Sequence, residues 1–548
     1  MALISAVVAA LTAQPAIAAK RVTVPDPART YVVARAAELS GEHSRSAALL
    51  AQLAEAEADN KSLSRRAASQ AISAGEMQLA IRLGRQMPPA SATTDVRLLL
   101  AADELLHGRA DRALTYIESK GEDGDLNFLA PYVRAWAAAD RKNVADALTT
   151  LEQVPLNSLL GGYVAEQRAY ILQKFRMNQD ADSYAQRAIA QASRRDIQVR
   201  LALADGFMAS GDKARALAML DLPTAEAAAA KARINAGQRL GFAVDNGAKA
   251  FGAMLLGLAL DLNRTNSNSL PIRLVQVARY ANPGDSSAAI ILGAMLQAQD
   301  RAADAMAAFR SIRPDDLLIA QARDAEARSL TQAKRYDAAL ALARAAIAAP
   351  GAGSTDFSRL GDIYSAMDKN ADAAAAYQRA LDLAGPQATD RWTLLLLKAS
   401  SLEAADRWPE AKRDLEAALK LAPDQPLILN FLGYAKLERG EDLDSAEAMI
   451  RKASQLAPDD ASITDSLGWA QYKRGKTTEA IDTLQRAAVA DPAQAEIREH
   501  LGDALYEAGR KFEARFAWEA ALVTADEEVV GRIKSKLEAG LNKSNGAP

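Results

Sequence analysis

The chain has 548 residues, of which 49% are hydrophobic and 25% charged, with a formal net charge of −3 and no cysteine. Because this length exceeds that of one ordinary domain, the chain must either divide into domains or extend its core by repetition. The lack of cysteine excludes disulfides and thiolate metal sites. The lack of a lysine- and arginine-rich run argues against nucleic-acid binding.

Residues 1–19 have the pattern of a secretory signal peptide. An apolar stretch runs from Leu3 to Leu11, and Ala16 and Ala18 follow in the small-residue pattern of a cleavage site. The positively charged start of such signals is missing, so an uncleaved first helix is the alternative. We expect an exported, periplasmic protein, and the alternative is a cytoplasmic one. No later stretch is apolar over the ~18 residues that a membrane span needs.

Alanines recur at a nearly constant interval along the chain. In the N-terminal part the interval is 33 to 35 residues, and these alanines are Ala47, Ala80, Ala113, Ala147, Ala181 and Ala216. In the C-terminal part the interval is 34 to 38 residues, and these are Ala305, Ala339, Ala373, Ala411, Ala446, Ala480 and Ala514. A fixed period in the thirties is typical of stacked two-helix units. We therefore predict a degenerate array at 27–222 and a regular array at 284–524.

Residues 223–283 interrupt this period. Their sequence is rich in alanine and leucine, which favours helices, and it has few carboxylates and no histidine. We predict an irregular helical segment whose role the sequence does not reveal. A hidden enzyme in this segment is a weaker alternative, because the residue types of acid–base and nucleophilic catalysis are scarce there.

The two similar segments SLGWAQYKRG and HLGDALYEAG, at 466–475 and 500–509, explain the period physically. Each has a glycine twelve residues before an alanine, as with Gly468 and Ala480. Small residues at both places allow two helices to cross closely, and Gly475 and Gly509 allow the chain to reverse. One such hairpin cannot bury its own apolar face, so neighbouring hairpins must stack. The sequence therefore predicts an all-α fold.

These motifs resemble the tetratricopeptide repeat (TPR). Its pattern of tryptophan, leucine, glycine and tyrosine, followed by alanines and proline, is met in one unit by Phe357, Leu360, Gly361, Tyr364, Ala373, Tyr377 and Ala380. The last two units carry Leu467, Gly468, Ala480, Leu484, Ala487 and Pro492, then Leu501, Gly502, Ala514, Trp518 and Ala521. The resemblance implies an α-solenoid of about 13 to 14 stacked units that form a superhelix.

Residues 525–548 follow the last unit and are predicted to end the array. A helix here would place Val530, Ile533, Leu537 and Leu541 on one face and charged residues on the other. We expect this cap helix to shield the last repeat from water, with a loose polar tail, KSNGAP, after it.

The TPR resemblance also implies a candidate binding site. In such repeats the first helix of each unit lines a concave groove, and the matching positions here form an aromatic strip edged by carboxylates. The implied groove residues are Asn430, Tyr434, Asp465, Trp469, Tyr472, Lys473, Glu499, Asp503 and Tyr506. Aromatic side chains supply large contact areas at interfaces. Alternatively, Trp469 and Tyr472 pack between stacked helices, and the sequence leaves both interpretations open.

No group of residues predicts catalysis. His43, His107 and His500 are far apart in sequence and lack metal-ligand spacing, and no Gly-x-Ser-x-Gly nucleophile motif occurs. We expect no enzyme activity, no cofactor and no metal. The chain resembles bacterial exported TPR scaffolds, which implies protein or peptide partners in a cell-envelope assembly for secretion, pili, polysaccharide export or wall synthesis. A membrane-associated complex would then form through partners.

Overall fold

The computed structural model describes residues 24, 26–57, 59–121, 123–158, 160–263, 269–386, 388–542 and 546–547. Within these ranges every regular element is a helix, and β-structure is limited to one isolated bridge between Gly121 and Gly124. The predicted all-α class is confirmed. The predicted signal segment, 1–19, lies outside the described residues. No helix in these ranges combines the length and the apolar character that crossing a bilayer requires.

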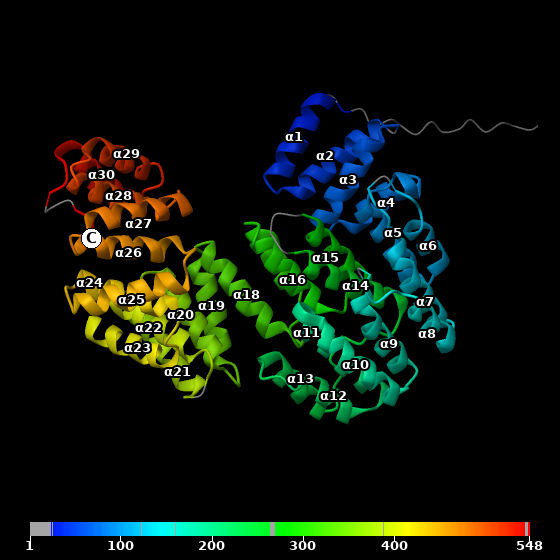
Figure 1. Ribbon diagram of the computed structural model, residues 1–548. Helices are drawn as coiled ribbons and strands as arrows, with labels where there is room; N and C mark the ends of the chain where they lie inside the picture. Colours follow the sequence, from blue (N-terminus) through cyan, green and yellow to red (C-terminus); the bar gives the residue numbers. More distant parts are fainter. Residues whose placement is uncertain are drawn as a thin grey trace, which may run out of the picture. The chain divides into compact units, whose positions relative to one another are not determined.

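The chain falls into two compact units, Met1–Ser329 and Leu330–Pro548, and the division lies within α18. Figure 1 shows each unit as a series of antiparallel helices. The helices of the first unit are α1 (Pro27–Leu39), α2 (His43–Ala56), α3 (Lys61–Ala74), α4 (Met77–Arg85), α5 (Thr94–Leu106), α6 (Ala110–Ile117), α7 (Ala130–Asp140), α8 (Val144–Glu152), α9 (Val164–Lys174), α10 (Asn178–Ala192), α11 (Asp196–Ser210), α12 (Lys213–Met219), α13 (Ala225–Asn235), α14 (Gly247–Leu262), α15 (Ser269–Ala281), α16 (Ser286–Gln297) and α17 (Ala302–Arg310).

The second unit continues the same hairpins. Its helices, with the shared α18, are α18 (Ile319–Gln332), α19 (Tyr336–Ala348), α20 (Ser354–Ala366), α21 (Asn370–Ala384), α22 (Arg391–Ala404), α23 (Trp408–Leu421), α24 (Pro426–Glu438), α25 (Leu443–Leu456), α26 (Ala461–Lys473), α27 (Thr477–Ala490), α28 (Ala495–Glu507), α29 (Lys511–Ala521) and α30 (Glu527–Ala539). Short 3₁₀ turns lie at Pro89–Ser91, Asn127–Leu129, Gly161–Tyr163 and Ser193–Arg195. The stacked hairpins and the final α30 agree with the predicted helical array and its cap helix.

The alanine ladder marks the second helix of each hairpin. Every alanine of both ladders lies near the start of such a helix and is fully buried, with 0% of its surface exposed. A hydrogen bond also closes each of these first turns, as from the Ala480 N–H to the Lys476 carbonyl. Since only a methyl group fits between helices at this depth, the ladder survives where other repeat residues have changed.

Two kinds of glycine shape the C-terminal hairpins. A Cβ atom at Gly468 would lie 2.6 Å from Leu484 Cγ on the partner helix, so α26 and α27 meet without a side chain between them. Gly475 and Gly509, with φ of 74° and 81°, end the first helices in the left-handed conformation that glycine adopts easily. The predicted close crossing and chain reversal are both present.

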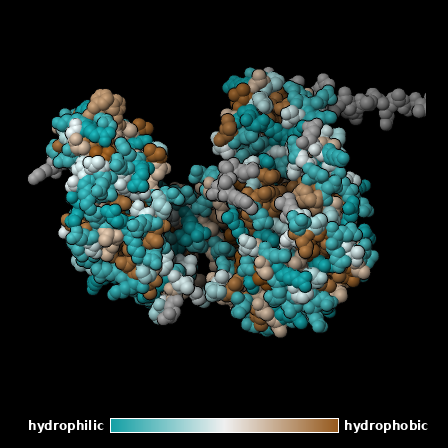
Figure 2. All heavy atoms as spheres, viewed as in Figure 1, coloured by the Kyte–Doolittle hydropathy of each residue, from teal (hydrophilic) through white to brown (hydrophobic). Residues whose placement is uncertain are grey.

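The N-terminal hairpins hold a second layer of helices from the same chain. α14 packs on α5 and α7, and α15 packs on α3 and α5, as Figure 1 shows for the green and cyan helices. On this side, hydrophobic residues gather over α14–α16 in an otherwise mostly hydrophilic surface (Figure 2). Within the segment predicted as irregular, 223–283, α14 and α15 therefore cover first helices of the N-terminal array, whereas α13 packs beside α11 and α12.

Polar contacts fix this second layer. Arg273 Nε on α15 lies 2.9 Å from Asp95 Oδ2 on α5, and the Tyr280 hydroxyl donates to Asp103 Oδ1 at 2.7 Å. On α14, the Asp261 carboxylate accepts a hydrogen bond from the Tyr163 hydroxyl, again at 2.7 Å. Because one partner of each pair is buried (Asp95, Asp103 and Tyr163), each pair gives the layer a defined position as well as stability.

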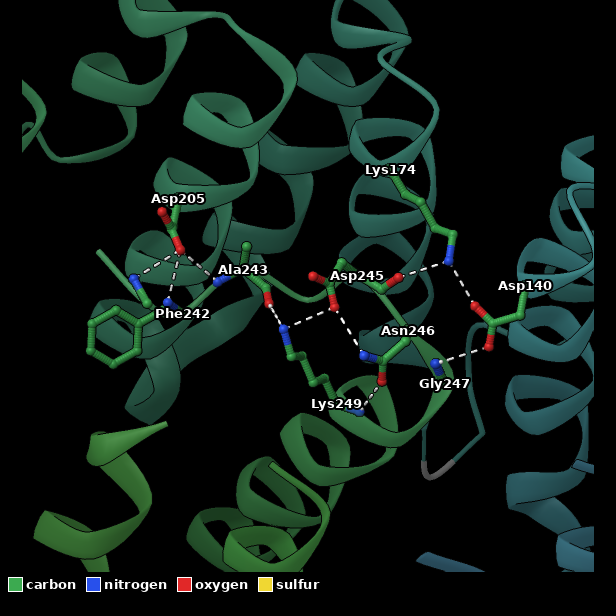
Figure 3. Close-up of polar contacts among 10 residues, drawn as sticks. Asp140, Lys174, Asp205, Phe242, Ala243, Asp245, Asn246, Gly247 and Lys249 are labelled. Carbon is green, nitrogen blue, oxygen red and sulfur yellow. Dashed lines mark hydrogen bonds and ion pairs between the residues drawn. The ribbon is translucent and has the colours of Figure 1, made fainter. Parts of the chain in front are cut away.

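The connection that leads into α14 wraps around one buried carboxylate, Asp205 of α11. Four successive backbone N–H groups, at residues 240–243, donate to its two oxygens at 2.9 to 3.0 Å, and Arg239 Nε donates at 2.7 Å. Figure 3 shows part of this arrangement beside Lys174, which bridges Asp140 and the Asp245 carbonyl. Burial alone raises the pKa of Asp205, but these donors lower it below its usual value.

Candidate partner-binding face

The implied groove residues lie on the first helices of three consecutive hairpins, α24, α26 and α28, and we call this surface the inner face. Its centre is Trp469, whose ring stacks on His500 at 4.2 Å between centroids and on Tyr472 at 4.8 Å. Trp469 is only 1% exposed. The structure thus favours packing for Trp469 itself, while Tyr472 is half-buried and reaches the surface.

Glu438 at the end of α24 ties this stack to its neighbour. The Trp469 indole N–H donates to Glu438 Oε1 at 2.8 Å, and the Lys473 ammonium lies 3.2 Å from Glu438 Oε2. Lys473 also lies over the Trp469 ring, 5.0 Å from its centroid, in a cation–π arrangement. Lys473 itself is exposed, so it provides a positive group at the edge of the aromatic stack.

Asp465 and His500 form a buried pair between α26 and α28. His500 Nδ1 lies 2.9 Å from Asp465 Oδ2. Burial alone lowers the pKa of His500, but the Asp465 carboxylate outweighs this effect and raises the pKa above its usual 6.5. The pair therefore favours the imidazolium form of His500, and it holds the ring parallel to Trp469.

Glu499 and Asp503 do not edge an open strip as predicted, because the cap helix α30 covers them. Arg532 donates to Glu499 Oε1 from Nε and to Oε2 from Nη2, both at 2.7 Å, and Lys536 Nζ lies 2.6 Å from Glu499 Oε1 and 2.7 Å from Asp503 Oδ2. Burial raises the pKa of Glu499, but the two cations lower it below its usual value. Both carboxylates are thus neutralised within the chain.

The burial of Lys536 contradicts the expected division of α30 into an apolar and a charged face. Its side chain is fully buried, and it follows Val529 and Ile533 on the side that packs on α28. Among the residues expected to face inward, Ile533 is buried, whereas Val530, Leu537 and Leu541 are partly exposed. A charge lies in the apolar face because Glu499 and Asp503 lie opposite it, and an unpaired buried carboxylate is costly.

Asp503 has further partners. Its Oδ1 accepts a hydrogen bond from the Trp518 indole N–H at 2.9 Å, and its Oδ2 accepts one from the backbone N–H of Ala547, also at 2.9 Å. The Ala547 side chain is 8% exposed and belongs to an apolar cluster with Leu437, Leu467 and Trp469. The expectation of a loose polar tail is therefore wrong for Ala547, which lies on the inner face.

The remaining implied residues are distributed along the same face. Tyr434 and Tyr472 pack against the Ala547 cluster, and Tyr506 packs against Trp518 with 5.5 Å between ring centroids. Asn430 is partly buried one turn before Tyr434 on α24. The structure thus brings the nine implied residues onto adjoining helices, with the three tyrosines and Lys473 reaching the surface.

The sequence left out four residues that complete the face: Glu438, His500, Lys536 and Ala547. The signal for Lys536 was its helical register with Val529 and Ile533. The signal for Glu438 was its position one turn after Tyr434 on the same first helix. No local pattern marks Ala547, since its contacts are with residues far away in the sequence. In the described part of the chain, no group of histidine and acidic residues is placed to hold a metal ion.

Comparisons with known proteins locate repeats in this region. Residues 396–461 and 466–528 match the tetratricopeptide-repeat family model, and no curated protein matches the chain. A tetratricopeptide repeat protein from Parabacteroides merdae is 13% identical over 47% of this chain and 99% of its own, with a TM-score of 0.38. The APC/C hetero-tetramer Cut9–Hcn1 is 12% identical over 95% and 97%, with a TM-score of 0.39.

A thermophilic TPR protein of Thermus thermophilus is 22% identical over 34% of this chain and all of its own (100%), with a TM-score of 0.31. These likenesses are too distant to carry a functional argument. The family match coincides with the hairpins whose close crossings and buried alanines are described above. Residues 396–461 and 466–528 of the chain are thus tetratricopeptide repeats.

Proposed function

We propose that this protein is a non-catalytic scaffold that binds segments of partner proteins at the inner face of α24, α26 and α28. The tetratricopeptide fold serves protein–protein interaction, because its stacked hairpins offer an extended surface. We favour this over the catalytic alternative for 223–283, because Arg273 and Tyr280 of that segment bind Asp95 and Asp103 on α5, as packing contacts would.

The aromatic stack of the inner face is the main support for this proposal. Trp469, His500 and Tyr472 form a fixed stack that is tied to Glu438 and Asp465, and Lys473 stands at its exposed edge. Trp469 and His500 are buried, so they pack within the unit and fix the ring of Tyr472, which reaches the surface. A rigid aromatic ring at the surface loses little side-chain freedom on binding, and it supplies the contact area that dominates many interfaces.

The test replaces aromatic pairs on two faces of the same hairpins. We expect Tyr472→Ser with Tyr506→Ser to reduce capture of partners by the tagged full chain, because both rings reach the surface of the inner face. The matched control is Phe512→Ser with Phe516→Ser on α29, where the exposed rings contact each other. Equal capture by both double variants, with unchanged helical circular dichroism, would overturn the proposed site.

We also propose that the assembly belongs to a bacterial cell envelope, with a cytoplasmic adaptor as the alternative. The support is the signal-like pattern of residues 1–19 and the resemblance to exported scaffolds. N-terminal sequencing of the purified mature protein separates the two. A chain that starts near residue 19 or 20 supports export, and one that starts at Met1 contradicts it.

A further inference from the structure

The end of α30 directs the chain back toward the inner face. Gly540 ends the helix with φ of 75°, and its N–H donates to the Lys536 carbonyl at 2.8 Å. A Cβ atom at Gly540 would collide with the Tyr506 hydroxyl, so the backbone itself lies against α28. Leu541 then packs partly into the core of the last hairpin. Gly540 and Leu541 are thus held against the helix that carries part of the proposed site.

Ala547 makes two kinds of contact there. Its backbone N–H donates to Asp503 Oδ2 at 2.9 Å, and its methyl group lies in the cluster of Leu437, Leu467 and Trp469. Gly546 beside it is exposed. A backbone donor with an inserted small side chain is the contact pattern of an extended peptide in a groove, where the main chain gives affinity and a pocket reads one side chain.

Asp503 is held ready for such a donor. Lys536 contacts both of its oxygens, at 2.8 and 2.7 Å, and the Trp518 indole donates to Oδ1. These partners come from α29 and α30, so they fix the carboxylate without help from the segment at 546–547. An acceptor that is already oriented costs little further ordering when a peptide N–H binds to it.

We propose that Gly546–Ala547 is an internal ligand that occupies the peptide site of the inner face, and that a partner displaces it with an extended segment carrying an alanine-sized side chain. This inference rests on the proposed function of the inner face. The small side chain is required because Ala547 is 8% exposed within the apolar cluster that includes Leu437, Leu467 and Trp469, which leaves little room for a larger group. The backbone donor to Asp503 requires a free N–H at this position, which an extended segment provides and the interior of a helix does not.

The internal ligand competes with partner peptides and so lowers their apparent affinity for the site. A segment tethered by a short linker competes at an effective concentration on the order of millimolar. A free peptide with the same contacts should therefore bind the wild-type chain at least about tenfold more weakly than a chain whose own segment has been released.

The experiment measures fluorescence anisotropy of a labelled peptide, LNKSNGAP, which copies residues 541–548. The full-length chains are wild type, Ala547→Asp and Ala547→Trp. Aspartate places a second carboxylate beside Asp503, and tryptophan overfills the cluster, so both release the internal ligand by different means. Ala493→Asp, on an exposed turn of the same unit, is the matched control.

We expect both Ala547 variants to bind the peptide at least about tenfold more tightly than wild type and the control do. A peptide in which tryptophan replaces the alanine should lose binding to all four chains. Absence of binding to either Ala547 variant, or equal binding by all chains, would overturn the inference. Equal affinity of the alanine and tryptophan peptides would also overturn the inference, because the site would then not discriminate by the size of that side chain.

This outcome is separable from that of the proposed function. If the tyrosine pair at 472 and 506 governs partner capture but the peptide binds neither Ala547 variant, the inference fails while the proposed function stands. If the peptide binds as expected but partner capture ignores both tyrosines, the proposed function fails, and 546–547 is only a structural contact.

Discussion

The close crossing of α26 and α27 predicts a specific cost for one methyl group. In Gly468→Ala the added Cβ would lie 2.6 and 2.8 Å from Leu484 Cγ and Cδ2, and 3.2 Å from the Leu484 backbone N. The backbone contact prevents full relief by rotation of the leucine. Overpacking of this kind costs about 1–3 kcal/mol, and alanine returns about 1 kcal/mol through its better helix propensity.

The matched substitution is Gly531→Ala, in the exposed part of α30, where no atom lies within 4 Å of the new Cβ. It should stabilise its helix by up to about 1 kcal/mol. The two glycine-to-alanine changes should thus differ by roughly the overpacking term, about 1–3 kcal/mol. We expect Gly468→Ala to lie on the destabilised side of this comparison.

Hydrogen exchange followed by mass spectrometry is the suitable assay, because stacked repeats open locally and one unfolding midpoint does not describe them. Exchange in α26 and α27 should accelerate in Gly468→Ala and slow slightly for α30 in Gly531→Ala. Leu484→Ala removes the two obstructing side-chain atoms and leaves only the backbone N contact, so Gly468→Ala in that background should cost less than it does in the wild-type chain. The close-packing explanation is wrong if both glycine variants behave alike or if the leucine background changes nothing.

Three further predictions concern buried charges. The pKa of His500 is raised, so its pair with Asp465 stabilises the fold fully below pH 6.5, and this stabilisation is lost as the pH rises through the folded-state pKa. Hydrogen exchange in α26 and α28, measured as a function of pH, checks this prediction. Asp465→Asn should remove the pH dependence. Lys536→Met should lower the local opening free energy of α28 and α30, measured by hydrogen exchange, by about 3–5 kcal/mol, since two buried acids lose a cation, whereas a loss below about 1 kcal/mol would contradict the buried pairing. Asp205→Asn should accelerate exchange at residues 236–246 at least tenfold, because an unsatisfied buried donor costs about 1–3 kcal/mol, and unchanged exchange there would refute the anchoring role.

The helical array could be predicted because its information is local. Gly468, Ala480 and Gly475 each act within one hairpin, and repetition every 33 to 38 residues makes the pattern visible in the sequence. The same spacing placed the first helices of successive units side by side, so the inner-face residues Asp465 and Trp469 were assigned to one surface. Their register with His500 across α26 and α28 follows from stacking alone.

The packing of α14 and α15 on the N-terminal helices, and of α30 on α28, could not be predicted, because it depends on contacts between distant segments. Nothing near Tyr280 in the sequence indicates that it bonds to Asp103, 177 residues away. Likewise, the buried states of Glu499 and Lys536 arise only when α30 lies on α28. A carboxylate in a repeat has the same local pattern whether water or a lysine lies opposite, so the sequence placed Glu499 at an open edge.

Thiol labelling can show whether the inner face of α24, α26 and α28 holds an extended segment of its own chain. The chain has no cysteine, so Ala547→Cys introduces a single reactive group in place of a side chain that is 8% exposed. Asn542→Cys, at an exposed position of the same segment, is the reference, and both variants are also labelled in denaturant. We expect at least tenfold slower alkylation of Ala547→Cys in the native chain, equal rates in denaturant, and faster native labelling when excess LNKSNGAP peptide is added. Equal native rates for the two variants would mean that the segment does not occupy the inner face.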